Sequence, residues 1–284
     1  MNPNMIRRME LKNGPDRTTP GRTGGTPFPA WVAWIAHAFT GLGLVLAAGM
    51  AVCIVEGTPE AYRWAFGLML VACLVDSTDG ALARRLHVKE MLPGFDGAKL
   101  DDIIDFLTFT SLPLLLIWRA ELLPDDMEWV LVVALVASAY GFCQVNAKTA
   151  DGYFVGFPSY WNIVAFYLYA LSMPAWLAAV LILLLAGLTF VPSYYLYPSR
   201  GATLSRLTSF LGGVWVVVLL WVLWELPTNE LPADARAADV RAAENNFRWA
   251  LVSLLYPIYY MTVSWALTIR RWRAASEAAG ANRG

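Results

Sequence analysis

Charged side chains are scarce in this 284-residue chain. Only 15% of the residues are Asp, Glu, Lys or Arg, whereas 58% are hydrophobic. A water-soluble domain of this length needs more polar side chains to cover its surface. The formal net charge is −1, so the chain has no overall basic field to attract a phosphate backbone, which argues against a nucleic-acid partner.

Cysteine is also rare, with Cys53, Cys73 and Cys143 as the three residues of this type. Each lies in a hydrophobic block, and their spacing matches neither a metal site nor a redox pair. We interpret them as small apolar packing residues.

The hydrophobic residues are gathered in blocks of roughly 20, the length that crosses a hydrocarbon core about 30 Å thick. Most of these blocks lack the polar face of a water-soluble helix. They predict an all-α, polytopic membrane bundle with eight transmembrane helices, near residues 29–55, 60–86, 98–119, 127–147, 158–173, 175–197, 204–225 and 246–269.

The segments around the bundle predict its orientation. We expect a disordered cytosolic tail at 1–27, a transmembrane domain at 28–272 and a cytosolic tail at 273–284, with a polar loop at 227–245 that contains at most one short helical turn. With both termini in the cytosol, 16 of the 21 Lys and Arg residues fall in cytosolic segments. This distribution matches the positive-inside bias.

Four aspartates stand where the second predicted span ends and the third begins. Asp76 and Asp79 are three residues apart. Asp101 and Asp105 are four apart, so each pair lies on one face of its helix. Two consecutive antiparallel helices can therefore bring four carboxylates to one point. Asp102 is off the shared face, and we expect it to be a non-ligand that could support a ligand from behind.

The density of carboxylates predicts a metal site. Charges in or near lipid are costly, and like charges add to that cost, so the four groups cannot all stay ionised without cations. Hard oxygen ligands suit Mg²⁺ or Mn²⁺, and two ions could share the cluster. Because divalent ions suit phosphate chemistry, we expect a metal-lined cavity that opens to the cytosol and handles phosphate groups.

Small and basic residues accompany the aspartates. Gly80, Ala83 and Gly97 leave room for a nucleotide to lie against the backbone. Arg84 can grip a diphosphate through its planar guanidinium.

The pattern Asp-x2-Asp-Gly-x2-Ala-Arg…Gly-x3-Asp-x3-Asp resembles the signature of the CDP-alcohol phosphotransferases, and all eight defining positions are present. The resemblance implies that Asp105 helps to bind metal and acts as the catalytic base. The implied metal ligands are Asp76, Asp79, Asp101 and Asp105. The implied nucleotide-binding residues are Asp76, Asp79, Gly80, Ala83, Arg84 and Gly97.

The spacer between the two halves of the signature has twelve residues, more than in most members of the superfamily. This longer spacer resembles the branch of the bacterial phosphatidylcholine synthases, as do the stretches 141–149, 151–162, 190–192 and 197–200. Over roughly residues 30–270, the resemblance implies transfer of a phosphatidyl group from CDP-diacylglycerol to choline. It also implies a bacterial inner-membrane enzyme that forms a homodimer.

The loop between the fourth and fifth predicted spans is unusually aromatic. A quaternary ammonium cannot donate ordinary hydrogen bonds, so its partners are aromatic faces and a nearby negative charge. A choline cage is one interpretation of this loop, and an aromatic belt at headgroup depth among membrane lipids is the other. The candidate choline contacts are Asp151, Tyr153, Phe157, Tyr160, Trp161 and Asn162.

A few polar residues outside these groups have two interpretations each. His37, which shares the first span with Thr40, could support the nucleotide or a carboxylate, or be a hydrogen-bonded packing residue. Arg200 and Arg206 could meet the lipid phosphate or be ordinary positive-inside charges.

Two alternative functions stay open. The same chemistry could use serine, glycerol 3-phosphate or an inositol phosphate, although anionic acceptors want a basic pocket and the loop offers only Lys148. A cation-coupled secondary transporter would predict paired repeats and a cluster at the midplane. We find no repeat, and the aspartates lie at a span end.

Overall fold

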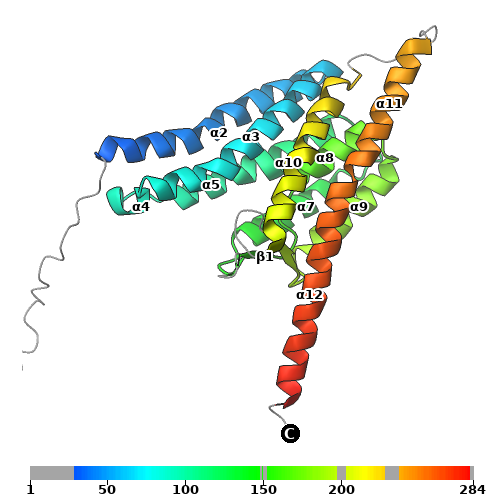
Figure 1. Cartoon of the computed structure of the whole chain (residues 1–284). Coiled ribbons are helices and arrows are strands. Elements are labelled where there is room, and N and C mark those ends of the chain that lie inside the picture. Colours follow the sequence, from blue (N-terminus) through cyan, green and yellow to red (C-terminus); the bar gives the residue numbers. More distant parts are fainter. Residues whose placement is uncertain (1–28, 148, 150–151, 197–202, 228–236, 282–284) are drawn as a thin grey trace, which may run out of the picture.

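The computed structural model describes residues 29–147, 149, 152–196, 203–227 and 237–281. Helices make up most of the described chain (Figure 1). The first two long helices, α2 (Ala30–Glu56) and α3 (Pro59–Arg85), lie side by side as an antiparallel hairpin.

The turn between α2 and α3 is defined by three consecutive residues. Gly57 ends α2 in the left-handed conformation, with φ at 72°, which glycine adopts without a steric penalty. Thr58 caps α3, because its hydroxyl accepts a hydrogen bond from the N–H of Ala61 at 3.1 Å. Pro59 takes the first helical position, where no N–H is needed. The second helix therefore returns directly along the first.

A third helical run follows after the short α4 (Val88–Met91). It consists of α5 (Gly97–Asp105), η1 (Phe106–Ser111) and α6 (Leu112–Arg119) without a break. The segment η1 is a π-helix, in which each N–H bonds to the carbonyl five residues before it. It begins at the residue after Asp105, so the change of helix type lies directly beside the predicted catalytic base.

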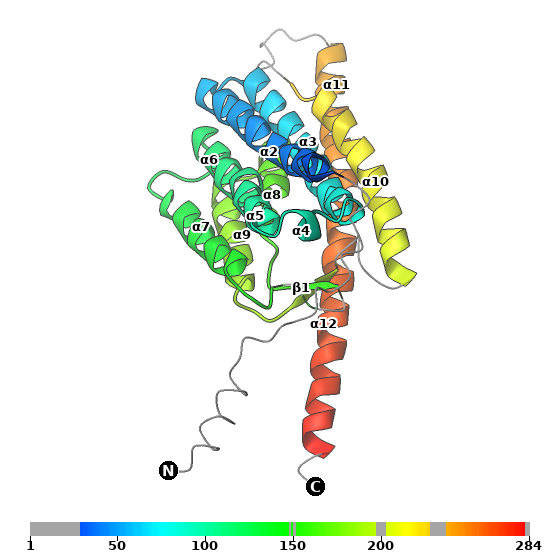
Figure 2. The ribbon, with the colours of Figure 1, turned by 90° about the vertical axis from the view of Figure 1, so that its left-hand side faces the viewer.

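Three shorter helices pack against this part of the bundle: α7 (Trp129–Phe142), α8 (Trp161–Ala170) and α9 (Ala175–Leu188). Their contacts with α2, α3 and α6 form the main hydrophobic core, with Met50, Phe66, Leu116 and Trp161 almost fully buried. In Figure 2, α7 and α9 lie on the opposite side of the molecule from α10 (Thr203–Trp224).

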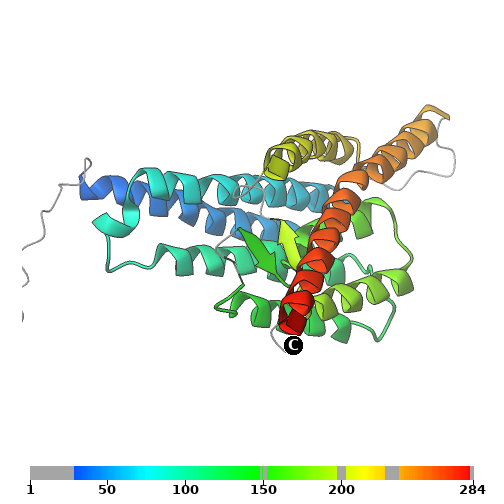
Figure 3. The ribbon, with the colours of Figure 1, turned by 60° about the horizontal axis from the view of Figure 1, so that its bottom comes forward.

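A two-stranded antiparallel sheet joins β1 (Tyr153–Val155) to β2 (Tyr194–Leu196). The last helix, α12 (Leu255–Ala281), runs beside β2 (Figure 3). The N–H of Tyr194 donates to the hydroxyl of Thr268 at 2.7 Å, and the N–H of Leu196 donates to the hydroxyl of Ser264 at 3.3 Å. Helix hydroxyls therefore take the place of a third strand.

The last two helices form a long rod that crosses the bundle (Figure 1). It is interrupted at Leu254, between α11 (Ala237–Ser253) and α12. Pro257 accounts for the interruption, because proline has no N–H to donate to the carbonyl of Ser253 and its ring crowds that carbonyl.

Four helices in the described part of the chain are long and apolar enough to cross a membrane: Trp31–Glu56, Pro59–Arg85, Arg206–Trp224 and Ala243–Glu277. The helices α7 and α9 are apolar but shorter. The chain is therefore a largely helical membrane protein, as the sequence predicts. Four of the eight expected spans meet the length criterion.

Three sequence-based expectations about the elements are wrong. The span expected at 175–197 ends at Leu188, and residues 194–196 form β2 instead. The loop after the fourth span contains β1, because its tyrosine, phenylalanine and valine favour extended backbone and find a partner strand. The loop expected at 227–245 is helical from Ala237. The expected tail at 1–27 lies outside the described residues.

Candidate active site

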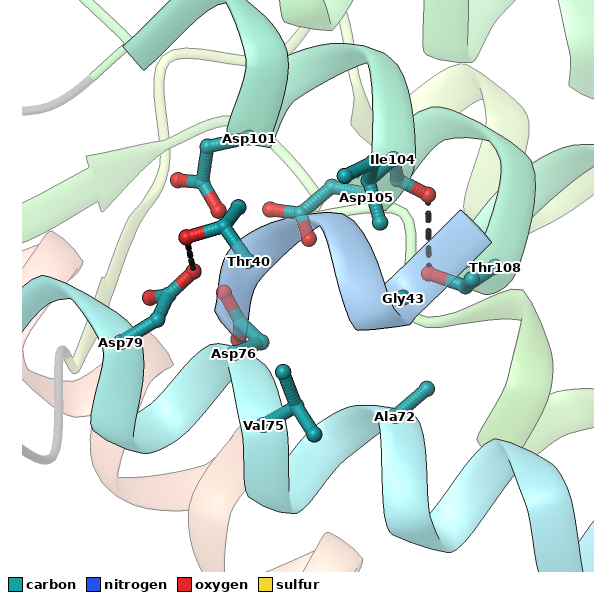
Figure 4. A pocket seen from close by; sticks show the side chains of 10 residues that line it. All are labelled: Thr40, Gly43, Ala72, Val75, Asp76, Asp79, Asp101, Ile104, Asp105 and Thr108. Atoms are coloured by element: carbon teal, nitrogen blue, oxygen red, sulfur yellow. Dashed lines mark hydrogen bonds between the residues drawn. The ribbon is translucent and has the colours of Figure 1, made fainter. Parts of the chain in front are cut away.

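A pocket lies between α2, α3 and the α5–η1 run (Figure 4). The acidic helices α3 and α5 supply its carboxylates, and α2 closes it from a third side. The lining residues are Thr40, Gly43, Ala72, Val75, Asp76, Asp79, Asp101, Ile104, Asp105 and Thr108.

Three of the four predicted metal ligands form a compact cluster in this pocket. Asp76 comes from α3, while Asp101 and Asp105 come from one face of α5. Each offers a carboxylate oxygen, and these oxygens all lie within 4.8 Å of one another. Carboxylates this close repel each other unless a cation or a proton neutralises them. The all-oxygen donor set therefore fits a hard divalent cation such as Mg²⁺ or Mn²⁺.

Asp79 lines the same pocket, and its carboxylate is hydrogen-bonded to α2. Its side chain is only 6% exposed, and Oδ2 accepts a hydrogen bond from the hydroxyl of Thr40 at 2.8 Å (Figure 4). Asp102, which follows Asp101 on α5, is exposed and does not line the pocket. The pocket thus contains a cluster of three aspartates and a fourth aspartate held by α2.

Two glycines allow α2 to approach the acidic helices closely. A Cβ at Gly43 would collide with the side chain of Ile104 on α5. A Cβ at Gly97 would lie 2.5 Å from Cε1 of His37. The space beside Gly97, which the sequence suggested for a nucleotide, therefore receives the ring of His37.

The ring of His37 is enclosed but incompletely hydrogen-bonded. It is 8% exposed, and Nε2 has no hydrogen-bond partner among the described residues. The ring of Phe95 lies 4.4 Å away and that of Trp34 lies 5.8 Å away, measured between centroids. Phe95 belongs to the long spacer of the signature, so that spacer helps to cover His37.

The remaining residues predicted for the nucleotide lie on the last turns of α3. Arg84 is exposed, and its Nη1 would lie 3.3 Å from a Cβ added at Gly80. The guanidinium of Arg84 therefore folds back over that glycine. Ala83 is partly buried and packs beside Ala33 and Val88.

Comparison with known proteins identifies the family to which the chain belongs. The CDP-alcohol phosphatidyltransferase family matches residues 33–269, which include every residue that lines the pocket. The chain belongs to this family. A transferase family favours the phosphatidyl-transfer interpretation of the aspartates over the transporter alternative.

Several relatives of this transferase are named phosphatidylcholine synthase. A phosphatidylcholine synthase of Pseudomonas aeruginosa is 42% identical over 193 residues, which are 68% of this chain and 80% of the relative. A phosphatidylcholine synthase of Legionella pneumophila is 39% identical over 172 residues, which are 60% of this chain and 66% of the relative. A third, from Bradyrhizobium diazoefficiens, is 36% identical over 200 residues, covering 69% of this chain and 74% of the relative.

Two of the residues predicted to bind choline lie in the core of the transferase. Phe157 is 7% exposed and Trp161 is 0% exposed, and their rings meet edge to face with centroids 5.5 Å apart. The indole N–H of Trp161 donates to the hydroxyl of Ser138 at 2.7 Å. Both rings therefore have protein on every side.

Asn162 connects the predicted acceptor loop to an acidic helix. Its Nδ2 donates to Sγ of Cys73 at 3.1 Å, and Cys73 lies one turn before Asp76 on α3. The side chain is 5% exposed, and Oδ1 has no hydrogen-bond partner among the described residues. A buried amide oxygen that lacks a partner is costly, so this atom is available to a bound hydroxyl or water.

The predicted tyrosines lie around the sheet and α12. The guanidinium carbon of Arg271 is 4.2 Å from the ring centroid of Tyr153. Tyr160 meets the ring of Tyr260 at 6.3 Å, and Tyr260 stacks on Tyr195 at 6.4 Å. This group could not be predicted from the sequence, because Tyr195 and Tyr260 fell inside expected spans.

Three further predictions concern charged residues. Asp151 and Arg200 lie outside the described residues. Arg206 is exposed near the start of α10.

The hydrogen bond between Thr40 and Asp79 was not predicted, although the spacing of three residues between His37 and Thr40 places both side chains on the same face of α2.

Proposed function

We propose that this enzyme transfers the phosphatidyl group of CDP-diacylglycerol to the hydroxyl of choline, giving phosphatidylcholine and CMP. The observation that carries the proposal is the convergence of Asp76, Asp101 and Asp105 within 4.8 Å, on the two signature helices of a CDP-alcohol phosphatidyltransferase. The names of the relatives support choline as the acceptor.

The four pocket aspartates are the proposed ligands of two divalent ions, Mn²⁺ or Mg²⁺. The cluster of three offers oxygens from two helices, and Asp79 offers a carboxylate oxygen from the same pocket. When bound, such ions neutralise phosphoryl oxygens and allow a diphosphate to lie beside the carboxylates. Without them, a diphosphate would be repelled by the acidic pocket.

Asp105 is the proposed general base. It takes the proton of the choline hydroxyl, and the hydroxyl oxygen forms a bond to the phosphorus that carries the diacylglycerol. The bond from that phosphorus to the oxygen bridging it to CMP breaks, and the electron pair leaves with CMP. The proton then passes from Asp105 to solvent. Because the choline oxygen attacks the phosphorus directly, no covalent enzyme intermediate is required.

The substrates are proposed to lie on opposite sides of the aspartates. The CDP moiety lies against Gly80 and Ala83, with Arg84 at the diphosphate and the acyl chains in the membrane, while the ring of His37 occupies the space beside Gly97. Choline enters from the side of the aromatic loop, where Asn162 faces its hydroxyl end. The proposed contacts of its ammonium group are Asp151, Tyr153 and Tyr160, while the enclosed rings of Phe157 and Trp161 support the loop from within the core. The proposed contacts of the lipid phosphate are Arg200 and Arg206.

The proposed setting is the inner membrane of a bacterium, with eight spans, both termini in the cytosol and the pocket facing the cytosol. The concentration of Lys and Arg in the corresponding segments supports this orientation. The homodimer implied by the family resemblance is tested by chemical crosslinking of the protein in its membrane.

A single assay tests the acceptor. Purified enzyme receives CDP-diacylglycerol together with labelled choline, serine or glycerol 3-phosphate, and the lipid products are separated. We expect label in lipid with choline alone, with one CMP released per phosphatidylcholine formed. Label from serine or glycerol 3-phosphate in place of choline would refute the acceptor and leave the chemistry standing.

A pair of adjacent aspartates tests the base. We expect Asp105→Asn to lower turnover by at least about a hundredfold, because the amide cannot accept the hydroxyl proton. CDP-diacylglycerol should still bind to this variant. Asp102→Asn is the matched control, since Asp102 is exposed on the same helix and outside the pocket. Normal turnover of Asp105→Asn would remove the proposed base.

A further inference from the structure

The first helix contributes a hydrogen bond to the pocket, although no signature residue lies on it. The hydroxyl of Thr40 is 2.8 Å from Oδ2 of Asp79 and 3.4 Å from the carbonyl oxygen of Ala36. A threonine hydroxyl has one hydrogen to donate. The shorter contact, to an acceptor that can carry a charge, takes that hydrogen.

The packing of α2 keeps Thr40 in this position. One turn further along, Gly43 lies directly against Ile104 of α5, at a distance that leaves no room for a Cβ. Asp79 itself is 6% exposed, so water has little access to its carboxylate. The hydroxyl therefore links a buried carboxylate of α3 to a helix that is fixed against α5.

Asp79 differs from the other pocket aspartates in its position. Asp76, Asp101 and Asp105 form the compact cluster, while Asp79 lines the pocket from beside it. A side chain of this kind can rotate about two bonds, and each unproductive rotamer weakens a metal site. Hydrogen bonds to ligating carboxylates commonly remove this freedom.

We propose that Thr40 is a positioning residue that holds the carboxylate of Asp79 in place for divalent metal binding. This inference rests on the proposed function, because it requires that the pocket binds a metal. Thr40 acts through Asp79, because its hydroxyl hydrogen is donated to that carboxylate. Its contribution is to fix one of the ligand side chains before the ion arrives.

The test is Mn²⁺ binding to the purified, substrate-free enzyme, measured by calorimetry and by the electron paramagnetic resonance signal of free Mn²⁺. Thr40→Val removes the hydroxyl and keeps the shape of the side chain. We expect it to weaken Mn²⁺ binding about tenfold or more, the usual effect of losing a partner behind a metal ligand. Thr40→Ser restores the hydroxyl and should bind Mn²⁺ almost as the unchanged enzyme does.

Activity assays add a second readout. The Mn²⁺ concentration that gives half-maximal activity should rise in Thr40→Val, while the KM for choline stays unchanged. Thr262→Val is the matched control, because the Thr262 hydroxyl is exposed on α12 and bonds only to the helix carbonyl of Ile258. Thr40→Ala repeats the test in case valine disturbs the packing of α2.

The outcomes separate this inference from the function on which it rests. If the unchanged enzyme binds no Mn²⁺ at all, the proposed metal centre fails and the role of Thr40 fails with it. If the unchanged enzyme binds Mn²⁺ and both Thr40→Val and Thr40→Ala bind it equally well, the metal centre stands and the role of Thr40 is refuted. Weak binding by Thr40→Ser as well would show that shape, and not the hydroxyl, is what matters, and would also refute it.

Discussion

Gly97 has no side chain, and the ring of His37 occupies the space beside it. We expect Gly97→Ala to destabilise the protein by about 1–3 kcal/mol, because the new methyl group would lie 2.5 Å from Cε1 of His37. Thermal unfolding in detergent measures the change. Gly94→Ala is the control, since nothing lies within 4 Å of a Cβ at Gly94.

A double variant identifies the cause. If the clash with His37 is responsible, Gly97→Ala combined with His37→Ala should be more stable than the sum of the two single changes allows. If stability is regained but activity is not, the glycine also serves the nucleotide. Strictly additive losses would exclude the ring as the reason for a glycine at this position.

Trp161 gives a prediction about the acceptor loop. Its ring is fully buried and its N–H is bonded to Ser138, so Trp161→Phe should cost roughly 1–3 kcal/mol through the lost hydrogen bond and the smaller ring. The KM for choline should not change, because no face of this ring is open to a ligand. Trp176→Phe, at a position 64% exposed, is the control. A raised KM for choline with normal stability would instead show that Trp161 contacts choline.

At the scale of elements, the bond between β2 and α12 can be tested directly. Thr268→Val removes the oxygen that accepts from the N–H of Tyr194 at 2.7 Å, and leaves that N–H without its partner. We expect a loss of about 1–3 kcal/mol in thermal or denaturant unfolding. Thr262→Val on the same helix removes an exposed hydroxyl and should have little effect. Equal losses in the two variants would show that the helix, and not the strand, is being destabilised.

The first two long helices could be predicted almost to the residue. The expected spans 29–55 and 60–86 correspond to Ala30–Glu56 and Pro59–Arg85, because long apolar runs there end at glycine, threonine and proline. The two strands could not be predicted. Each has three residues, they are about 40 residues apart in the chain, and only their pairing makes them strands.

The site was predictable to a similar degree. Spacing along two helices was enough to place Asp101 and Asp105 on one face of α5. The antiparallel course of α3 and α5 was enough to bring Asp76 to them. The bond from Thr40 to Asp79 depends on how α2 packs against α3 and α5, which no spacing within one helix contains. Long-range contacts of this kind require the fold.

For the molecule as a whole, metal binding should be visible as stability. A folded protein that gathers three carboxylates within 4.8 Å gains from a cation that the unfolded chain cannot bind as well. At an Mn²⁺ concentration one hundred times Kd, we expect about 2.7 kcal/mol of stabilisation. The measurement is the thermal midpoint with Mn²⁺ and after EDTA treatment, which should also abolish turnover.

Two controls accompany the metal experiment. Asp76→Asn should lose most of the Mn²⁺-dependent rise, because one ligand is gone. Sodium chloride at equal ionic strength distinguishes specific binding from general screening of like charges. Full activity after EDTA treatment, or an equal rise with sodium, would contradict a specific metal centre.

The π-helix η1, which starts at the residue after Asp105, sets the angular phase between the two halves of the third helical run. A π turn holds one residue more than an α turn, so residues 106–111 turn through a smaller angle per residue than an α-helix does. If the same residues adopted α geometry, the preceding segment would turn by roughly 100° relative to α6, the angle that one residue occupies in an α-helix. Asp101 and Asp105 would then rotate away from Asp76 although every apolar side chain of α6 kept its place. A change of hydrogen-bond pattern over little more than one turn would thus disconnect the acidic face from its partner helix without shortening the helical run.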